Sequence, residues 1–205
     1  MKKNGFTLAE VLITLVIIGV ISALAVPALI QNTQKQEYVS ALKKAYSTLS
    51  QAMQEIIAEE GSPKGDGGWV KDAESVYNLF KQHLNVLKDC GSSAGCFNQL
   101  GSTANKGYKH LDKSTREYTS HNFNIDAAGR KLILADGVQI FFTSGGGSMY
   151  IDINGEKAPN QFGRDVFYFI IDENGLKPYC SGGCTNESGG QSCACKILTD
   201  GAMNY

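Results

Sequence analysis

The stretch that decides the fold is Phe6–Ile30, which reads FTLAEVLITLVIIGVISALAVPALI. It is rich in Leu, Ile and Val, and Glu10 is its only charged residue. As a helix this stretch would be about 37 Å long, whereas the hydrocarbon core of a bilayer is about 30 Å thick. The sequence therefore predicts a membrane-spanning helix over residues 6–30.

The charges and cysteines indicate which side of the membrane each end occupies. Lys2 and Lys3 favour a cytoplasmic N-terminus, but Lys35, Lys43 and Lys44 flank the other side, so the charge rule alone does not decide. An even number of cysteines beyond the apolar stretch is typical of disulfides in an oxidising compartment. We therefore expect the C-terminal part outside the cytoplasm, with six disulfide candidates: Cys90, Cys96, Cys180, Cys184, Cys193 and Cys195.

The helix is expected to continue through residues 31–60 as an amphipathic segment. Apolar residues recur there at steps of three and four, and Gly61-Ser62-Pro63 would end the helix. Pro27 and Gly19 mark a segment that could bend or melt, although both residue types are common in membrane helices. The repeating apolar positions are Tyr38, Leu42, Ala45, Leu49, Ala52 and Ile56.

The rest of the chain, residues 61–205, is expected to form one extracytoplasmic α+β domain. A second amphipathic helix is predicted over residues 71–89, and a tail at 180–205 is expected to be held by crosslinks rather than by a core. Asp136-Gly137 is a strong hairpin signal between two apolar runs. The fold class is thus a long N-terminal helix packed on an antiparallel sheet of about four strands, at Lys131–Leu134, Val138–Thr143, Met149–Ile153 and Val166–Asp172.

The N-terminus resembles that of type IV pilins and the related type II secretion pseudopilins. The residues that carry the resemblance are Lys2-Lys3-Asn4-Gly5, then Phe6-Thr7-Leu8-Ala9-Glu10, then the apolar run through Pro27. The resemblance implies that residues 1–5 are a leader, which a prepilin peptidase removes by cleavage between Gly5 and Phe6. It also implies N-methylation of Phe6 and a role for Glu10 in assembly, through pairing with the N-terminal amine of a neighbouring subunit.

The chemistry of Glu10 agrees with a functional role. An unpaired carboxylate deep in a membrane helix costs about 2.5–3.5 kcal/mol or more. The nearest cation of the processed chain would be the amine of Phe6. Pairing between subunits would also set their axial register, whereas the simpler alternatives are a protonated Glu10 or a pair with Phe6 of the same chain.

The resemblance implies a structural function without cofactors. Subunits would wait in the cytoplasmic membrane with the N-terminus inside, until an assembly platform moves them into an extracytoplasmic filament of pilin or pseudopilin subunits. One alternative is a minor tip pilin that binds DNA, a surface or a secreted substrate. A membrane-tethered enzyme has no catalytic signature in its favour, and a net charge of −1 argues against a dedicated nucleic-acid binder. Cleavage of a secretory signal after Ala25 is a further alternative.

Two groups of residues could in principle bind a metal ion, the cysteines zinc and one acidic loop calcium. Cys90 and Cys96 enclose a short loop and are expected to bridge each other. The four later cysteines allow three pairings, and we expect Cys193 and Cys195 each to reach back to Cys180 or Cys184 rather than to hold zinc. A weak calcium candidate is formed by Asp152, Asn154 and Asp165, but this loop lacks the closing Glu of an EF-hand and a self-capped turn is the simpler interpretation.

Overall fold

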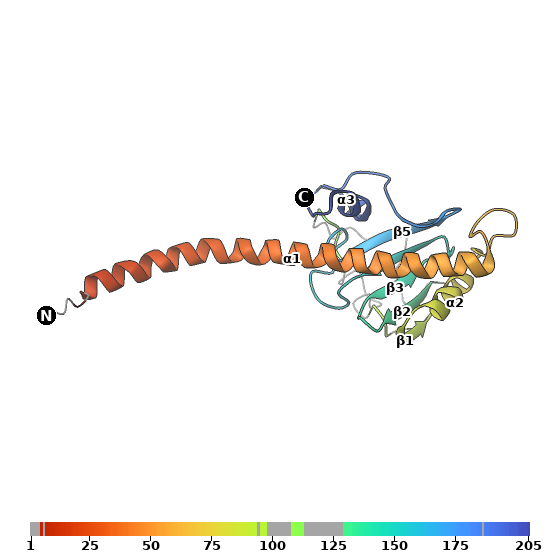
Figure 1. Cartoon of the computed structure of the whole chain (residues 1–205), viewed down its shortest axis with the longest axis horizontal. Helices are drawn as coiled ribbons and strands as arrows, with labels where there is room; N and C mark the ends of the chain where they lie inside the picture. The colour runs from red at the N-terminus through yellow and green to blue at the C-terminus, as the bar shows by residue number, and fades with distance from the viewer. Residues whose placement is uncertain (1–4, 6, 94, 98–107, 113–128, 186) are drawn as a thin grey trace. The chain divides into compact units, whose positions relative to one another are not determined.

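The computed structural model describes residues 5, 7–93, 95–97, 108–112, 129–185 and 187–205. The chain divides into two compact units, Met1–Glu37 and Tyr38–Tyr205. Helix α1 (Leu8–Glu60) contributes to both of them (Figure 1). The prediction of one long N-terminal helix is confirmed, and Pro27 lies inside it. A bend or melting between Gly19 and Pro27 stays a prediction.

The second half of α1 carries the predicted apolar stripe into the core of the globular unit. Leu42, Leu49 and Ile56 are fully buried, whereas Ser47 and Gln51 on the same turns are exposed. Tyr46 stacks on Phe169 of the sheet with ring centroids 5.5 Å apart. This spacing of apolar residues therefore fixes which face of α1 meets the sheet.

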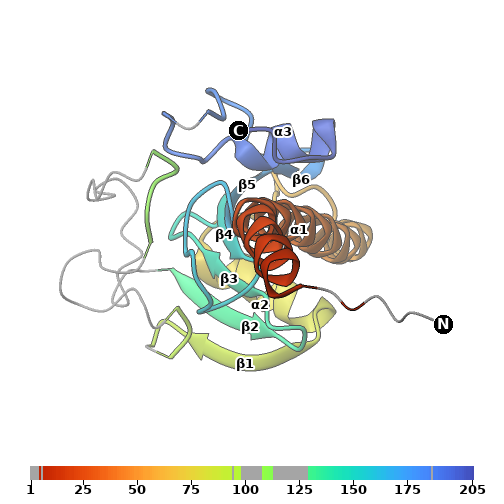
Figure 2. The ribbon, with the colours of Figure 1, turned by 90° about the vertical axis from the view of Figure 1, so that its left-hand side faces the viewer.

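The sheet has six antiparallel strands that follow one another in chain order from β1 to β6. Figure 2 shows them side by side, with α1 lying across one face of the sheet. Each strand pairs with the next in sequence. Short turns connect β2 to β3, β3 to β4, and β5 to β6. The strands are β1 (Val86–Gly91), β2 (Arg130–Leu134), β3 (Gln139–Phe142), β4 (Ser148–Asp152), β5 (Val166–Asp172) and β6 (Gly175–Pro178).

The prediction of a second helix over residues 71–89 is wrong at its C-terminal end. Helix α2 (Ala73–His83) is shorter, and Leu84 already has an extended backbone. After Leu84 the chain forms strand β1, which pairs with β2. This pairing gives the strand hydrogen bonds to β2 that a helix would not make. Leu87 lies at a register shift of β1 and is 69% exposed.

Local signals fix the N-terminal end of α2. The side chain of Asp72 accepts a hydrogen bond from the backbone N–H of Ser75 at 2.8 Å and so caps the helix. The backbone N–H of Ala73 donates to the carbonyl of Ser144 in the β3–β4 turn. Gly146 in that turn has a φ of 70°, and a Cβ there would lie 2.3 Å from the carbonyl oxygen of Asp72. The close approach of turn and helix therefore requires glycine at this position.

The two faces of the sheet support two separate apolar clusters. The face toward α1 contributes Phe142, Ile151 and Phe169 to the main core. The opposite face contributes Phe141 and Tyr150 to a smaller cluster. Loop residues complete this second cluster, among them Phe97, Phe162 and the disulfide-bonded Cys96.

The expectation that the tail is held by crosslinks rather than by a core is only half right. Residues Cys193–Asp200 form helix α3, which ends at Gly201 in the left-handed conformation. Ala194 and Ile197 are fully buried and belong to the main core together with Met203. The tail therefore contributes apolar burial as well as disulfides.

We expect Leu49→Ala to lower the free energy of unfolding by about 2–5 kcal/mol, because it leaves a cavity between α1 and the sheet. Ser47→Ala, on the exposed face of the same turn, is the matched control and should change stability by less than about 0.5 kcal/mol. Denaturant titration of the full chain in detergent micelles, followed by near-ultraviolet circular dichroism, measures both. Equal effects of the two substitutions would contradict the assignment of the buried face.

Candidate functional site in the N-terminal segment

The N-terminal unit presents an apolar surface that the described residues do not cover. From Leu8 to Ile30, every large apolar side chain that the structure describes is exposed, with Leu8 at 78%, Leu24 at 75% and Ile30 at 51%. Helix α1 is long and apolar enough to cross a membrane, and none of its most apolar part is buried in the protein. This arrangement differs from the core helix of a soluble domain, whose apolar residues are buried by other elements.

Thr7 and Glu10 form a capping box at the start of α1. The side-chain hydroxyl and the backbone N–H of Thr7 each donate to Oε2 of Glu10 at 2.8 Å. The backbone N–H of Glu10 in turn faces the hydroxyl oxygen of Thr7 at 3.3 Å. The helix begins at Leu8, directly after this cap. The box satisfies N–H groups that have no partner within a helix, and it places the negative charge at the positive end of the helix dipole.

Other polar side chains of this segment also bond to their own helix. The hydroxyl of Thr14 donates to the carbonyl of Val11 at 2.9 Å, and that of Thr33 donates to the carbonyl of Leu29 at 3.0 Å. Such bonds let a polar side chain enter an apolar environment without an unsatisfied donor. The segment therefore meets the requirement of a lipid phase that polar groups be satisfied internally.

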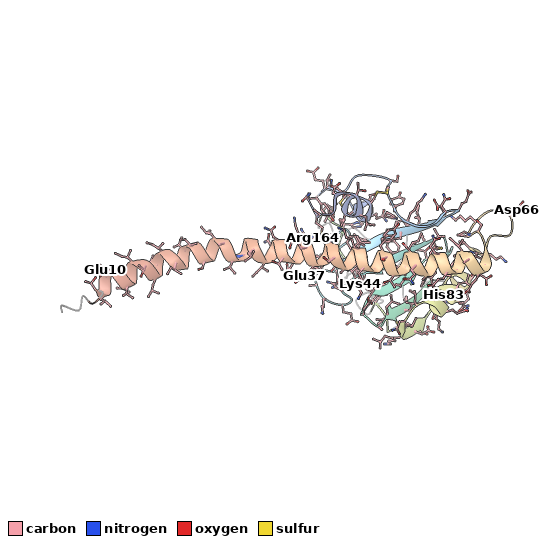
Figure 3. The ribbon with its side chains drawn as sticks, in the orientation of Figure 1. Glu10, Glu37, Lys44, Asp66, His83 and Arg164 are labelled. Atoms are coloured by element: carbon pink, nitrogen blue, oxygen red, sulfur yellow. A yellow bond between two sulfur atoms is a disulfide. The ribbon has the colours of Figure 1, made fainter. Side chains whose placement is uncertain are left out.

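The predicted processing and hinge residues lie at distinct places in this segment. Gly5 is exposed and precedes the helix, while Phe6 lies outside the described residues. Gly19 lies within α1, and a Cβ built there would meet no atom within 4 Å. Glu10 is in the first turn of α1, far along the helix from Glu37 (Figure 3).

Sequence reasoning missed Thr7 as the partner of Glu10. It weighed a protonated carboxyl and a pair with the Phe6 amine, whereas the structure shows hydrogen bonds within Thr7-Leu8-Ala9-Glu10. The signal was present, because Ser or Thr followed three residues later by Glu is the sequence pattern of a capping box.

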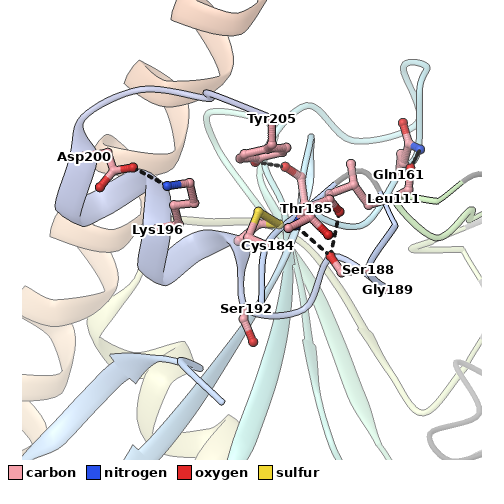
Figure 4. Close-up of a disulfide and its surroundings, with 12 residues drawn as sticks. Leu111, Gln161, Cys184, Thr185, Ser188, Gly189, Ser192, Lys196, Asp200 and Tyr205 are labelled. Carbon is pink, nitrogen blue, oxygen red and sulfur yellow. Dashed lines mark hydrogen bonds and ion pairs between the residues drawn. A yellow bond between two sulfur atoms is a disulfide. The ribbon is translucent and has the colours of Figure 1, made fainter. Parts of the chain in front are cut away.

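The six cysteines form three disulfides. Cys90 pairs with Cys96, Cys180 with Cys195, and Cys184 with Cys193, so the last two bridges are nested. Figure 4 shows the Cys184 bridge beside the turn in which the Ser188 hydroxyl donates to the Thr185 carbonyl. Each of Cys193 and Cys195 reaches back to the earlier pair, as expected. Because all six sulfurs are bonded to one another, they offer no thiolate for zinc.

Of the calcium candidates, Asp152 ends β4, and Asn154 and Asp165 lie in the loop between β4 and β5. Tyr108 donates to one oxygen of Asp152 at 2.5 Å, and the backbone N–H of Asn154 donates to the other at 3.1 Å. The two oxygens of Asp165 accept from the backbone N–H groups of Asn160 and Gln161, at 2.7 and 2.6 Å. These hydrogen bonds satisfy both carboxylates, so the loop needs no cation to hold it. The side-chain oxygen of Asn154 is buried without a hydrogen-bond partner among the described residues. Calcium binding stays a prediction.

Burial dominates the titration of these two carboxyls. Asp152 and Asp165 are both fully buried. Loss of solvation raises the pKa of Asp152 to about 8, and the nearby charge of Asp165 acts in the same direction. Burial raises the pKa of Asp165 to about 6, against the effect of its backbone hydrogen bonds. The folded chain therefore favours the protonated form of these groups.

The fold and this segment together define a pilin-like class: a long N-terminal helix, apolar and uncovered at first and then packed on an antiparallel sheet, with a disulfide-linked C-terminal region. Residues 1–26 match the family model of the prokaryotic N-terminal methylation motif. This motif is the signature of type IV pilins and pseudopilins. No curated protein and no solved structure matches the chain significantly.

The buried carboxyls predict that stability falls as the pH rises. In the unfolded chain an aspartate has a pKa of about 3.9, so the stabilisation is complete below about pH 4 and is lost as the pH passes about 6 and about 8. Asp152→Asn keeps the shape of the side chain but cannot ionise. We expect it to reduce the loss of unfolding free energy between pH 5 and pH 8 by about 1–3 kcal/mol.

Denaturant titrations of the full chain in detergent micelles at the two pH values measure this difference. Asp66→Asn, in an exposed loop, is the matched control and should leave the pH dependence as it is in the unaltered chain. A pH dependence that Asp152→Asn leaves unchanged would refute the assignment. A marked rise in stability on adding calcium at pH 8, lost in Asp152→Asn, would instead favour the cation site.

Proposed function

We propose that this chain is a subunit of a type IV pilus-like or secretion pseudopilus filament. It is made as a membrane-inserted precursor, cleaved by a prepilin peptidase between Gly5 and Phe6, methylated at Phe6, and assembled through α1. The observation that carries the proposal is the coincidence of the methylation motif at residues 1–26 with a helix whose first half, through Ile30, has apolar residues that no part of the described chain covers.

The exposed apolar surface supports both stages of this life cycle. A contiguous surface of this kind does not remain in water as a monomer. Lipid covers it while the subunit waits in the cytoplasmic membrane, with the N-terminus inside. Helices of other subunits cover it after the assembly platform has moved the subunit into the filament outside the cytoplasm.

The leader and the scissile bond fit this scheme. Gly5 is exposed and lies outside the helix, so a protease can approach its backbone. Cleavage there removes the charges of Lys2 and Lys3, which would resist burial among apolar helices. It also creates an amine on Phe6, next to the cap formed by Thr7 and Glu10.

The capping box suggests how a carboxylate is tolerated before assembly. In the single chain Glu10 accepts two hydrogen bonds from Thr7, but no cation pairs with it among the described residues. We propose that the Phe6 amine of a neighbouring subunit supplies that cation in the filament. A pair of opposite charges in a medium of low dielectric constant is strong, so it would favour one axial register over others.

Gly5→Val should leave uncleaved precursor in the membrane, because a branched side chain blocks the approach of the peptidase to the scissile bond. Gly19→Ala is the matched control, since a Cβ at that position meets no neighbour, and it should be processed normally. N-terminal sequencing and intact mass of the membrane fraction measure processing. A mature chain that begins at Phe6 supports the proposal, whereas one that begins at Val26 would establish the signal-peptide alternative.

Glu10→Gln should insert into the membrane normally but enter filaments at least about tenfold less often, since it removes the charge and keeps the size of the side chain. Thr14→Val is the matched control, because the Thr14 hydroxyl bonds only to its own helix turn in the described structure. Immunoblots of sheared filament and membrane fractions give the ratio. Filament yields equal to those of the unaltered chain would show that the charge of Glu10 does not serve assembly.

A further inference from the structure

Both ring nitrogens of His83 face carboxylates of α1. Nδ1 lies 3.3 Å from Oε2 of Glu55, and Nε2 lies 3.3 Å from Oε2 of Glu59. His83, labelled in Figure 3, is the last residue of α2. The two glutamates are one helical turn apart near the end of α1. The histidine side chain is only 13% exposed, so solvent screens these contacts less than it would on an open surface.

This geometry fits the charged form of the ring. A neutral imidazole has one N–H, and its other nitrogen presents a lone pair. With carboxylates on both sides, the neutral ring would satisfy one glutamate and repel the other. The imidazolium ion donates from both nitrogens and satisfies both.

The ends of the two helices also place complementary charges beside each other. His83 stands in the last turn of α2, where the helix dipole stabilises a positive charge. The last turn of α1 holds Glu59 and Glu60 and no basic residue, which is the unfavourable arrangement for that helix end. A charge on His83 therefore offsets a repulsion that α1 carries within its own sequence.

Two lysines of these helices pair with other carboxylates. Lys81 of α2 pairs with Asp89 of β1, and Lys44 of α1 pairs with Asp136 of the β2–β3 turn. The side-chain amide of Gln51 donates to the second oxygen of Glu55 at 3.3 Å. Within the part of the chain that the structure describes, Glu55 and Glu59 are thus the charged groups that pair with His83.

We propose that His83 is a pH-sensitive latch between α2 and α1. The protonated ring fastens the last turn of α2 to the last turns of α1. Loss of the proton turns one of the two contacts from attraction to repulsion and loosens this corner of the globular unit. The latch is therefore closed while the ring carries both protons and loosened once it has lost one.

Hydrogen exchange of the full chain in detergent micelles tests the latch. After correction for intrinsic exchange rates, we expect the amides of residues 79–85 to be more protected at pH 5.5 than at pH 8. The expected ratio is on the order of three- to tenfold, the size of effect that one or two partly exposed ion pairs give. Residues 193–200 of α3 serve as an internal reference: they report the fall in overall stability expected from Asp152 and Asp165, and the ratio at residues 79–85 is taken relative to theirs.

Two variants separate the latch from general effects of pH. His83→Gln should abolish the pH dependence at residues 79–85, and His110→Gln, at a histidine that faces a backbone carbonyl, should leave it intact. If His83→Gln does not fold, the double substitution Glu55→Gln and Glu59→Gln decides, because both side chains are about half exposed and tolerate exchange. The proposal is overturned if residues 79–85 of the unaltered chain show no pH dependence beyond that of residues 193–200, or if His83→Gln or the double glutamate substitution retains it.

Discussion

The constraint on which the structure depends is an apolar helical surface that the described chain does not cover. Every large apolar residue from Leu8 to Ile30 whose side chain the structure describes is exposed, and Glu10 is the only charged residue in the stretch. Exposing such a surface to water costs free energy. The properties of the segment therefore follow from what replaces water around it, which we propose to be lipid first and other subunits later.

The apolar residues in the second half of α1 are buried by other parts of the same chain. From Tyr38 onward the apolar residues narrow to one stripe, and the sheet buries it. The apolar side chains of the sheet alternate, so one face meets α1 and the other needs a cover of its own. Loop residues such as Phe97 and Phe162 supply that cover, and the disulfide between Cys90 and Cys96 ties the chain next to Phe97.

How much the sequence could predict depended on the strength of the local signal. The long helix, its stripe and the hairpin at Asp136-Gly137 follow strong periodicity and turn patterns, and the structure confirms them. Strand β1 was missed because its residues continue a helical spacing, and only pairing with β2 makes them extended. Helix α3 was missed because Gly and Cys around it suggested a loop, whereas burial of Ile197 decides its conformation. The partner of Glu10 was missed although its capping pattern was readable.

The capping box also bears on why an acidic residue can stand at this position at all. The carboxylate of Glu10 closes the first turn of its own helix, so it stabilises the single chain even without a partner cation. Hydrogen bonds from Thr7 leave lone pairs on the carboxylate oxygens, and a further donor can approach them. One side chain therefore suits both stages of the proposed life cycle. Before assembly it completes a helix end, and in a filament it would accept the amine of a neighbour without giving up its bonds to Thr7.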